Sequence, residues 1–187
     1  MIECNESTCS IGSDCTNRRL TNFQPKRVIE TVEISEVPGR GYGLVSKAKL
    51  PCNTIVIEYI GELITESEKQ NRWAKYQSEN LHYVMSLTGG FYIDATLKGN
   101  WARFVNHSCK PNCIVKRIIV DRKPRIVFIT VTEISVEDQI TIAYDFDPSE
   151  NPQGCLCGEG LDNCLGIIGL KPKTVKKRKR SDEMSEV

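Results

Sequence analysis

The stretch GNWARFVNHSCKPN, residues 99–112, decides most of what the sequence says about the fold. Residues 99–105 fit a short helical turn, and the polar run after them holds His107 and Cys109. A single histidine at the edge of an apolar segment is most often a hydrogen-bonded core residue. Neither of the two histidines has a Ser or Cys partner in a nucleophile motif, so hydrolytic catalysis finds no support. The meaning of the stretch therefore depends on the rest of the chain.

A compact group of thiols lies near the carboxyl end, in CLCGEGLDNC at 155–164. Its three cysteines would leave one position of a tetrahedral zinc site open. Cys109 is the candidate for that position, and it would pin the carboxyl-terminal segment to the body of the protein. On spacing alone, isolated buried thiols remain the alternative. The candidate zinc ligands are Cys109, Cys155, Cys157 and Cys164.

The other cysteines form a second group and two singletons. The total of nine is odd, and the first thirty residues contain no apolar signal core, so a disulfide framework is a poor explanation. Cys4, Cys9 and Cys15 cluster at the start of the chain and are candidates for a second, incomplete zinc site. Cys52 and Cys113 have no spare partners, and we interpret both as small core residues.

Short segments rich in Val, Ile, Tyr and Thr predict a mainly β fold of small stacked sheets. One convincing helix covers 66–78, because Thr65 can cap it and Glu68 completes a capping box. The Gly-rich run at 39–43 precedes no helix pattern, which argues against dinucleotide binding. A ligand-cradling turn and a plain hairpin turn both stay open there. The predicted strands are 28–35, 43–46, 54–60, 83–87, 91–94, 113–120, 126–131 and 139–144.

Charge is distributed unevenly along the chain. The 187 residues include 25 Lys and Arg against 24 Asp and Glu, for a formal net charge of +1. Seven of the basic residues fall within 171–180, so the body before them is acidic. Such a run predicts a disordered tail for nuclear import or DNA contact, with a merely solubilising tail as the alternative. No apolar run approaches the roughly 18 residues of a membrane helix.

Together these features resemble one family. GRGYG at 39–43, EYIGE at 58–62, the stretch at 99–112 and ITIAY at 140–144 occur in that order, and the thiols at 155–164 follow. From about 28 to 170 the chain resembles SET-domain protein lysine methyltransferases with a post-SET zinc loop. The amino-terminal cysteines and NRRL at 17–20 resemble the end of an associated-with-SET region. This combination is most similar to the branch that methylates histone H3 at lysine 36.

The resemblance implies S-adenosylmethionine as cofactor and a structural zinc ion. Tyr144 matches the catalytic tyrosine, and Tyr83 flanks the point where cofactor and lysine channel meet. The implied substrate channel consists of Tyr83, Ile142, Tyr144 and Phe146. The implied cofactor-binding residues are Arg40, Gly41, Tyr42, His82, Tyr83, Arg103, Phe104, Asn106, His107, Gln153 and Leu156.

The resemblance also implies an architecture and a setting. It implies a SET β-clip fold whose carboxyl-terminal strands are threaded in a knot-like way. We expect a monomeric, nuclear, chromatin-associated enzyme that acts on the histone H3 tail in nucleosomes, without a membrane partner. The expected units are a partial associated-with-SET region at 1–22, the SET domain at 28–148, the zinc loop at 149–170 and the basic tail at 171–187.

Departures from the family pattern define the open alternatives. Ile142 stands where the family usually has Phe or Tyr, and it offers no phenol to hold a blocking water, which favours multiple methylation. The last two post-SET cysteines are further apart than usual, and the amino-terminal region holds only part of its thiols. A catalytically weak, SET-like chromatin scaffold and a zinc-stabilised interaction domain without cofactor therefore stand as alternatives.

Overall fold

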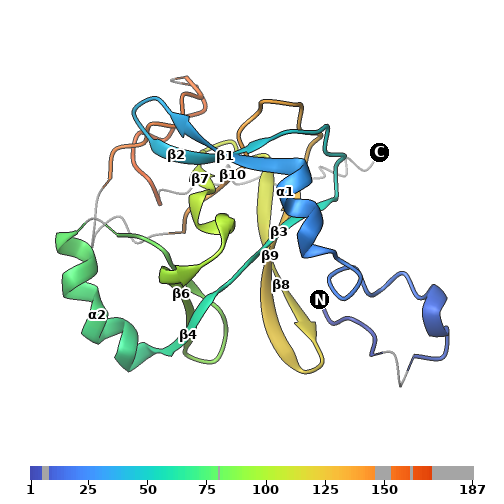
Figure 1. Cartoon of the computed structure of the whole chain (residues 1–187). Coiled ribbons are helices and arrows are strands. Elements are labelled where there is room, and N and C mark those ends of the chain that lie inside the picture. Colours follow the sequence, from blue (N-terminus) through green and yellow to red (C-terminus); the bar gives the residue numbers. More distant parts are fainter. Residues whose placement is uncertain (6–8, 80, 146–152, 161, 170–187) are drawn as a thin grey trace, which may run out of the picture.

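The structure, a computed structural model, describes residues 1–5, 9–79, 81–145, 153–160 and 162–169. These residues form four small β-sheets and one long helix (Figure 1). No helix among them is both long and apolar enough to cross a bilayer. The helices are α1 (Val28–Thr31) and α2 (Glu66–Ser78), and the 3₁₀ turns are Gly12–Asp14, Pro25–Arg27 and Trp101–Phe104. The strands are β1 (Val32–Val37), β2 (Gly41–Ser46), β3 (Ile55–Tyr59), β4 (Gly61–Thr65), β5 (Val84–Ser86), β6 (Phe91–Gly99), β7 (Asn106–His107), β8 (Cys113–Val120), β9 (Lys123–Thr130) and β10 (Thr141–Ile142).

The sheets are small and mostly antiparallel. Strands β1 and β2 form a hairpin, while the two three-stranded sheets have the orders β3-β9-β8 and β4-β6-β5. Strands β8 and β5 are therefore edge strands. The fourth sheet is the parallel pair β7 and β10, which sets Thr141 beside Asn106 and Ile142 beside His107. Because the two strands are parallel, this short pair places the residues after β10 beside the polar run that follows β7.

In the sheet β3-β9-β8, the central strand β9 is buried on both faces. One face joins the main core, where Phe128 and Ile126 lie with residues of β3 and β10. The other face contributes Val127 and Ile118 to a smaller cluster, which Leu20 of the amino-terminal segment covers. Because side chains alternate along a strand, consecutive apolar residues in β9 serve both cores.

Helix α2 and strand β8 have the predicted bounds. The Thr65 side chain accepts from the Glu68 amide, and the Glu68 carboxylate accepts from the Thr65 amide, so the capping box is confirmed. The predicted short helical turn is present as the 3₁₀ turn Trp101–Phe104, capped by Asn100. The helix, its capping box and the 3₁₀ turn depend on hydrogen bonds between residues close in sequence.

Other predicted elements need correction. The strand expected at 28–35 begins only at Val32, because the turn that starts at Pro25 continues into helix α1. Proline fixes a helical φ at the start of a helix, and this outweighs the β preference of Val28. Strands β4 and β7 were not predicted, and β10 is only two residues of the segment expected at 139–144.

Candidate active site and metal centre

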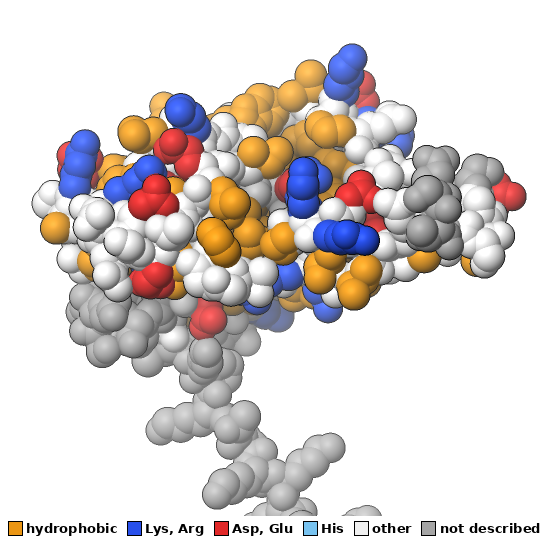
Figure 2. All heavy atoms as spheres, turned by 90° about the horizontal axis from the view of Figure 1, so that it is seen from below, with side chains coloured by type: hydrophobic (Ala, Val, Ile, Leu, Met, Phe, Trp, Pro, Cys, Tyr) orange, Lys and Arg blue, Asp and Glu red, His pale blue; other side chains and the backbone are white. Residues whose placement is uncertain are grey.

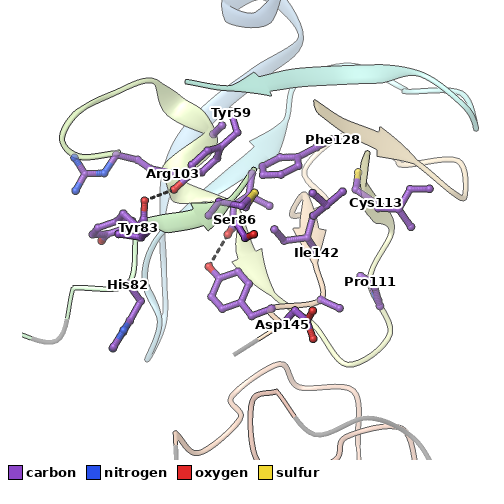
Figure 3. A pocket seen from close by; sticks show the side chains of 18 of the residues that line it. Tyr59, His82, Tyr83, Ser86, Arg103, Pro111, Cys113, Phe128, Ile142 and Asp145 are labelled. Carbon is purple, nitrogen blue, oxygen red and sulfur yellow. Dashed lines mark hydrogen bonds between the residues drawn. The ribbon is translucent and has the colours of Figure 1, made fainter. Parts of the chain in front are cut away.

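A cavity of about 440 Å³ lies between the edge strands β5 and β8 (Figure 3). Aromatic and aliphatic side chains from distant parts of the chain line it, namely Tyr59, Tyr83, Phe128, Ile142 and Tyr144. Three of these are predicted channel residues. The fourth predicted channel residue, Phe146, lies outside the described residues.

Tyr144 follows β10, and both ends of the residue are held. Its hydroxyl donates to the Val105 carbonyl at 2.6 Å, and its ring lies 5.5 Å from the His107 ring, centroid to centroid. Burial, with a smaller effect of nearby Tyr83, raises the pKa of the Tyr144 phenol. The group is therefore a neutral hydroxyl at physiological pH, fixed in one direction by the main chain.

Tyr83 lies where the cavity meets the 3₁₀ turn Trp101–Phe104. Its carbonyl accepts from the Tyr59 hydroxyl at 2.6 Å (Figure 3) and also from the Ala95 amide at 2.9 Å. The Arg103 guanidinium stacks over its ring at 4.1 Å. Tyr59 is a lining residue that the sequence analysis missed, although it belongs to the quoted run EYIGE.

The Gly-rich run forms the hairpin turn between β1 and β2, and this turn packs against Asn106. Asn106 donates to the Tyr42 carbonyl at 3.4 Å and to the Gln139 side chain at 3.2 Å. A Cβ at Gly43 would lie only 2.8 Å from the Asn106 amide nitrogen, so a side chain there would push the two apart. Gly41 has a φ of +68°, which only glycine adopts easily.

Further predicted cofactor residues gather around this turn. The Arg40 guanidinium donates to the His107 carbonyl, and the Tyr42 ring meets Phe104 edge to face at 6.5 Å between centroids. His82 and Gln153 touch through their side-chain nitrogens at 2.5 Å, and burial lowers the pKa of His82. Leu156 stays 64% exposed.

The predicted cofactor pocket contains a polar atom in need of a partner. The Arg103 Nε is buried, and it makes no hydrogen bond among the described residues. Buried donors without partners are uncommon in folded proteins. The carboxylate-bearing S-adenosylmethionine could satisfy this donor, while the open turn at Gly41 leaves room beside the backbone. The residues present therefore fit the implied cofactor.

The four predicted zinc ligands come together. The sulfur atoms of Cys109, Cys155, Cys157 and Cys164 all lie within 4.8 Å of one another, and those of Cys109 and Cys155 are 3.6 Å apart. Zinc–sulfur bonds of about 2.3 Å in a tetrahedron place sulfur atoms roughly 3.8 Å apart. Amides of the surrounding loop point at the sulfurs, with Leu165 donating to Cys109 and Gly166 to Cys164, each at 3.4 Å.

The pKa shifts in this cluster differ between its thiols, because burial raises the pKa of Cys109 and of Cys155. Burial acts to raise the pKa of Cys157, but hydrogen bonds from the Cys109 and Glu159 amides and neighbouring thiols lower it to about 7. Ser108, which the sequence analysis did not single out, donates to Glu159 at 2.8 Å and so ties the polar run to the same loop. The four residues thus fit a closed structural zinc site, which leaves no position for substrate.

The amino-terminal cysteines also come together, but with one thiol fewer. The sulfur atoms of Cys4, Cys9 and Cys15 lie within 4.8 Å of one another, and the side-chain amide of Asn17 donates to the Cys4 sulfur at 3.4 Å. Three thiols match the predicted incomplete site. Of the two singletons, Cys113 is fully buried as expected, whereas Cys52 is exposed, so its assignment to the core was wrong.

Comparisons with known proteins agree with this geometry. The SET domain family matches residues 41–145. A Chaetomium globosum protein named "Histone-lysine N-methyltransferase, H3 lysine-36 specific" is 39% identical over 181 residues, which cover 95% of this chain and 20% of that protein. Proteins of the same name from Cryptococcus neoformans and Schizosaccharomyces pombe are 38% and 36% identical, over 92% and 99% of this chain and 20% and 23% of their own lengths. The chain thus spans about a fifth of the length of these relatives.

Proposed function

The chain belongs to the SET-domain family, and we propose that it is a protein lysine methyltransferase that uses S-adenosylmethionine. The observation that carries the proposal is the Tyr144 hydroxyl, held on the Val105 carbonyl at one wall of an aromatic cavity. When bound, S-adenosylmethionine supplies an electrophilic methyl group on a positively charged sulfur. The residues of the chain must then present an uncharged amine to that group.

The cavity lining suits this task. A free lysine has a pKa of about 10.4, so its amine is protonated at neutral pH. Desolvation among Tyr59, Tyr83 and Phe128 would lower that pKa, and so would a nearby positive charge. Tyr144 would orient the amine, and alignment of reacting groups can by itself lower a barrier by about 7–11 kcal/mol in the best cases.

The walls of the cavity suggest an extended peptide as substrate. Both β5 and β8 are edge strands, and Met85 and Val115 of these strands line the cavity. Residues 1–3 already pair with β8 at Ile119, so the part of β8 beside the cavity is the part proposed for an added strand. An edge strand can pair with an added peptide strand. Arg117 spans the rim, where it donates to the Ser86 carbonyl at 3.0 Å. We propose that a histone H3 segment binds here and that lysine 36 is the target, as the names of the relatives suggest.

Charge and location complete the proposal. Figure 2 shows Lys and Arg side chains scattered among Asp and Glu on one face, with hydrophobic side chains between them. Acidic side chains do not gather into one patch on this face. The net negative charge of the body before residue 171 would attract a basic histone tail. The enzyme would act in the nucleus on chromatin. The tail at 171–187, with its predicted DNA contact, lies outside the described residues.

The decisive experiment compares two Tyr→Phe variants with labelled cofactor and nucleosomes. Tyr144→Phe removes the hydroxyl in the cavity and should lower kcat by about 10²- to 10³-fold while cofactor binding persists in calorimetry. Tyr76→Phe removes a buried hydroxyl outside the cavity, which donates to Asp94 at 2.7 Å, and should keep most of the activity. Equal labelling by wild type and Tyr144→Phe would reject Tyr144 as catalytic, and cofactor binding without transfer in the wild type would support the scaffold alternative.

We further propose that Ile142 allows more than one methyl transfer. It is 2% exposed and lines the cavity. Ile142→Phe should narrow the cavity and shift the products towards monomethyl lysine, as read by mass spectrometry of the modified peptide. Ile142→Val, which removes a single methylene, should keep the wild-type distribution. An unchanged distribution in the Phe variant would show that Ile142 does not limit the product.

A further inference from the structure

The side chain of His107 contacts both Tyr144 and the four-cysteine cluster. Its Nδ1 accepts a hydrogen bond from the main-chain amide of Tyr144 at 3.0 Å, and its Nε2 lies 3.4 Å from the Cys109 sulfur. An amide N–H can only donate, so Nδ1 must present its lone pair. The neutral ring then carries its proton on Nε2, where it points at a predicted metal ligand.

On the sulfur side, His107 belongs to a set of donors around the thiolates. Cys109 also accepts from the Leu165 amide at 3.4 Å, and its sulfur lies 3.6 Å from that of Cys155. Four thiolates carry more negative charge than one zinc ion neutralises, so N–H donors that point at the sulfurs stabilise the occupied site. Such outer partners typically contribute 10- to 100-fold in metal affinity or activity.

On the tyrosine side, His107 extends a strand pairing that is too short to reach Tyr144. The β7–β10 pair ends at Ile142, whose carbonyl accepts from the Ser108 amide at 2.9 Å. The next amide after β10 that points towards β7 belongs to Tyr144. The His107 imidazole accepts its hydrogen bond, in the place that a strand carbonyl would otherwise take. The main chain of Tyr144 is thereby fixed at its amide, while its hydroxyl is fixed on Val105 at 2.6 Å.

We propose that His107 is a positioning residue that couples the four-cysteine metal site to Tyr144, and that its two ring nitrogens have separable roles. Nε2–H stabilises the metal-bound form of Cys109, and Nδ1 sets the main chain that carries the Tyr144 hydroxyl. The second half of the proposal, the role of Nδ1, rests on the proposed function, since it takes Tyr144 as catalytic. The first half, the role of Nε2–H, does not, since zinc retention can be measured without any methyl transfer.

Two amide variants of the full chain separate the two bonds. His107→Asn can place an oxygen near the Nδ1 position but is too short to reach Cys109. His107→Gln can place an N–H near the Nε2 position but leaves no acceptor for the Tyr144 amide. We expect His107→Asn to release zinc to a chromogenic chelator about 10- to 100-fold faster than wild type. We expect His107→Gln to lose more kcat, on the order of 10- to 100-fold, at saturating cofactor and peptide.

The crossed pattern is the test, because a general loss of structure would move both readouts together. Equal losses of zinc retention and kcat in both variants, or no loss in either, would overturn the proposal. A tautomer measurement on the zinc-loaded wild type covers the case in which the variants do not fold. Long-range ¹H–¹⁵N spectra should show the His107 proton on Nε2, and a proton on Nδ1 would overturn the proposal. If the wild type transferred no methyl group, the proposed function would fail, yet zinc release and the tautomer would still decide the first half.

Discussion

The two cysteine clusters lie on opposite sides of the molecule and are connected to it differently (Figure 1). The four-cysteine cluster takes Cys109 from the run that also holds His107, so it adjoins the strand pair that leads to Tyr144. The three-cysteine cluster belongs to a segment that pairs with the outer edge of β8 near the end of that strand, where Ile2 is bridged to Ile119. There the buried Glu3 carboxylate accepts from the Thr21 amide at 3.0 Å and fastens the segment.

This difference teaches that similar ligands can serve different purposes in one chain. At the carboxyl side, loss of a thiol should disturb the loop over the predicted cofactor pocket and, through His107, the tyrosine. At the amino side, the segment contacts the cavity lining through the main chain of β8, where the Met1 amino group donates to the Arg117 carbonyl at 3.3 Å, and the three thiols lie outside that lining. We therefore expect the first cluster to govern activity and the second to govern only stability.

The largest difference should appear when a single cysteine is replaced in one cluster or in the other. Cys155→Ser should lose zinc from the four-cysteine site and lower turnover by more than the 10- to 100-fold that outer partners cost. Cys9→Ser should lower the melting temperature but keep turnover within about twofold, since its cluster does not adjoin the cavity.

Zinc content by elemental analysis, turnover and melting curves measure this contrast. Cys52→Ser is the matched control, because Cys52 is exposed and belongs to neither cluster. If Cys9→Ser reduced turnover as strongly as Cys155→Ser, the separation of activity from stability would be wrong.

An intermediate effect is expected at a charged network that touches neither cluster. Asp94 is fully buried on β6, where it accepts from Arg72 and Tyr76 at 2.7 Å each and from the Thr96 amide at 2.9 Å. Burial acts to raise the pKa of this carboxyl, but the hydrogen bonds from Thr96, Tyr76 and Arg72 outweigh it and hold the pKa below its usual range. Asp94→Asn should lower the free energy of unfolding at pH 7 by about 3 kcal/mol and leave both cysteine clusters intact.

The pH dependence follows from the direction of that shift. A lowered folded-state pKa gives stability that is present above the unfolded value of about 3.9 and is lost as pH falls through the folded-state value. Below about pH 5, the free energy of unfolding measured by urea titration should therefore fall less with decreasing pH in Asp94→Asn than in the wild type. Glu79→Gln, at an exposed pair with Lys75, should change stability by less than about 0.5 kcal/mol. If the free energy of unfolding of Asp94→Asn fell with decreasing pH as steeply as that of the wild type, this account would be wrong.

The smallest effect should come from the cap of helix α2, which lies away from both clusters (Figure 1). Thr65→Ala removes an acceptor for the Glu68 amide and should lower the free energy of unfolding by about 1 kcal/mol. Thr132→Ala, at an exposed position outside any helix, should have almost no effect. Chemical denaturation of both variants measures the difference. Zinc content and turnover should not change in either variant, and a loss of zinc from Thr65→Ala would show that the helix and the clusters are coupled.

The sequence by itself determined the features that residues near one another encode. Helix α2 was predicted to the residue because Thr65 and Glu68 form its capping box within a single turn. The four zinc-ligand candidates were predicted from one short motif and one recognisable run, and their sulfur atoms do lie within 4.8 Å of one another. The roles of the site residues stay predictions.

The tertiary structure decided what joins distant segments. Strands β7 and β10 are two residues each, too short for any periodic pattern, and they pair only because the surrounding sheets bring them together. The double engagement of His107, the lining role of Tyr59 and the exposure of Cys52 are likewise set by packing and not by local propensity. A hydrogen bond within one turn needs only the order of the side chains, whereas a contact across the fold also needs the chain between its partners to be closed and packed.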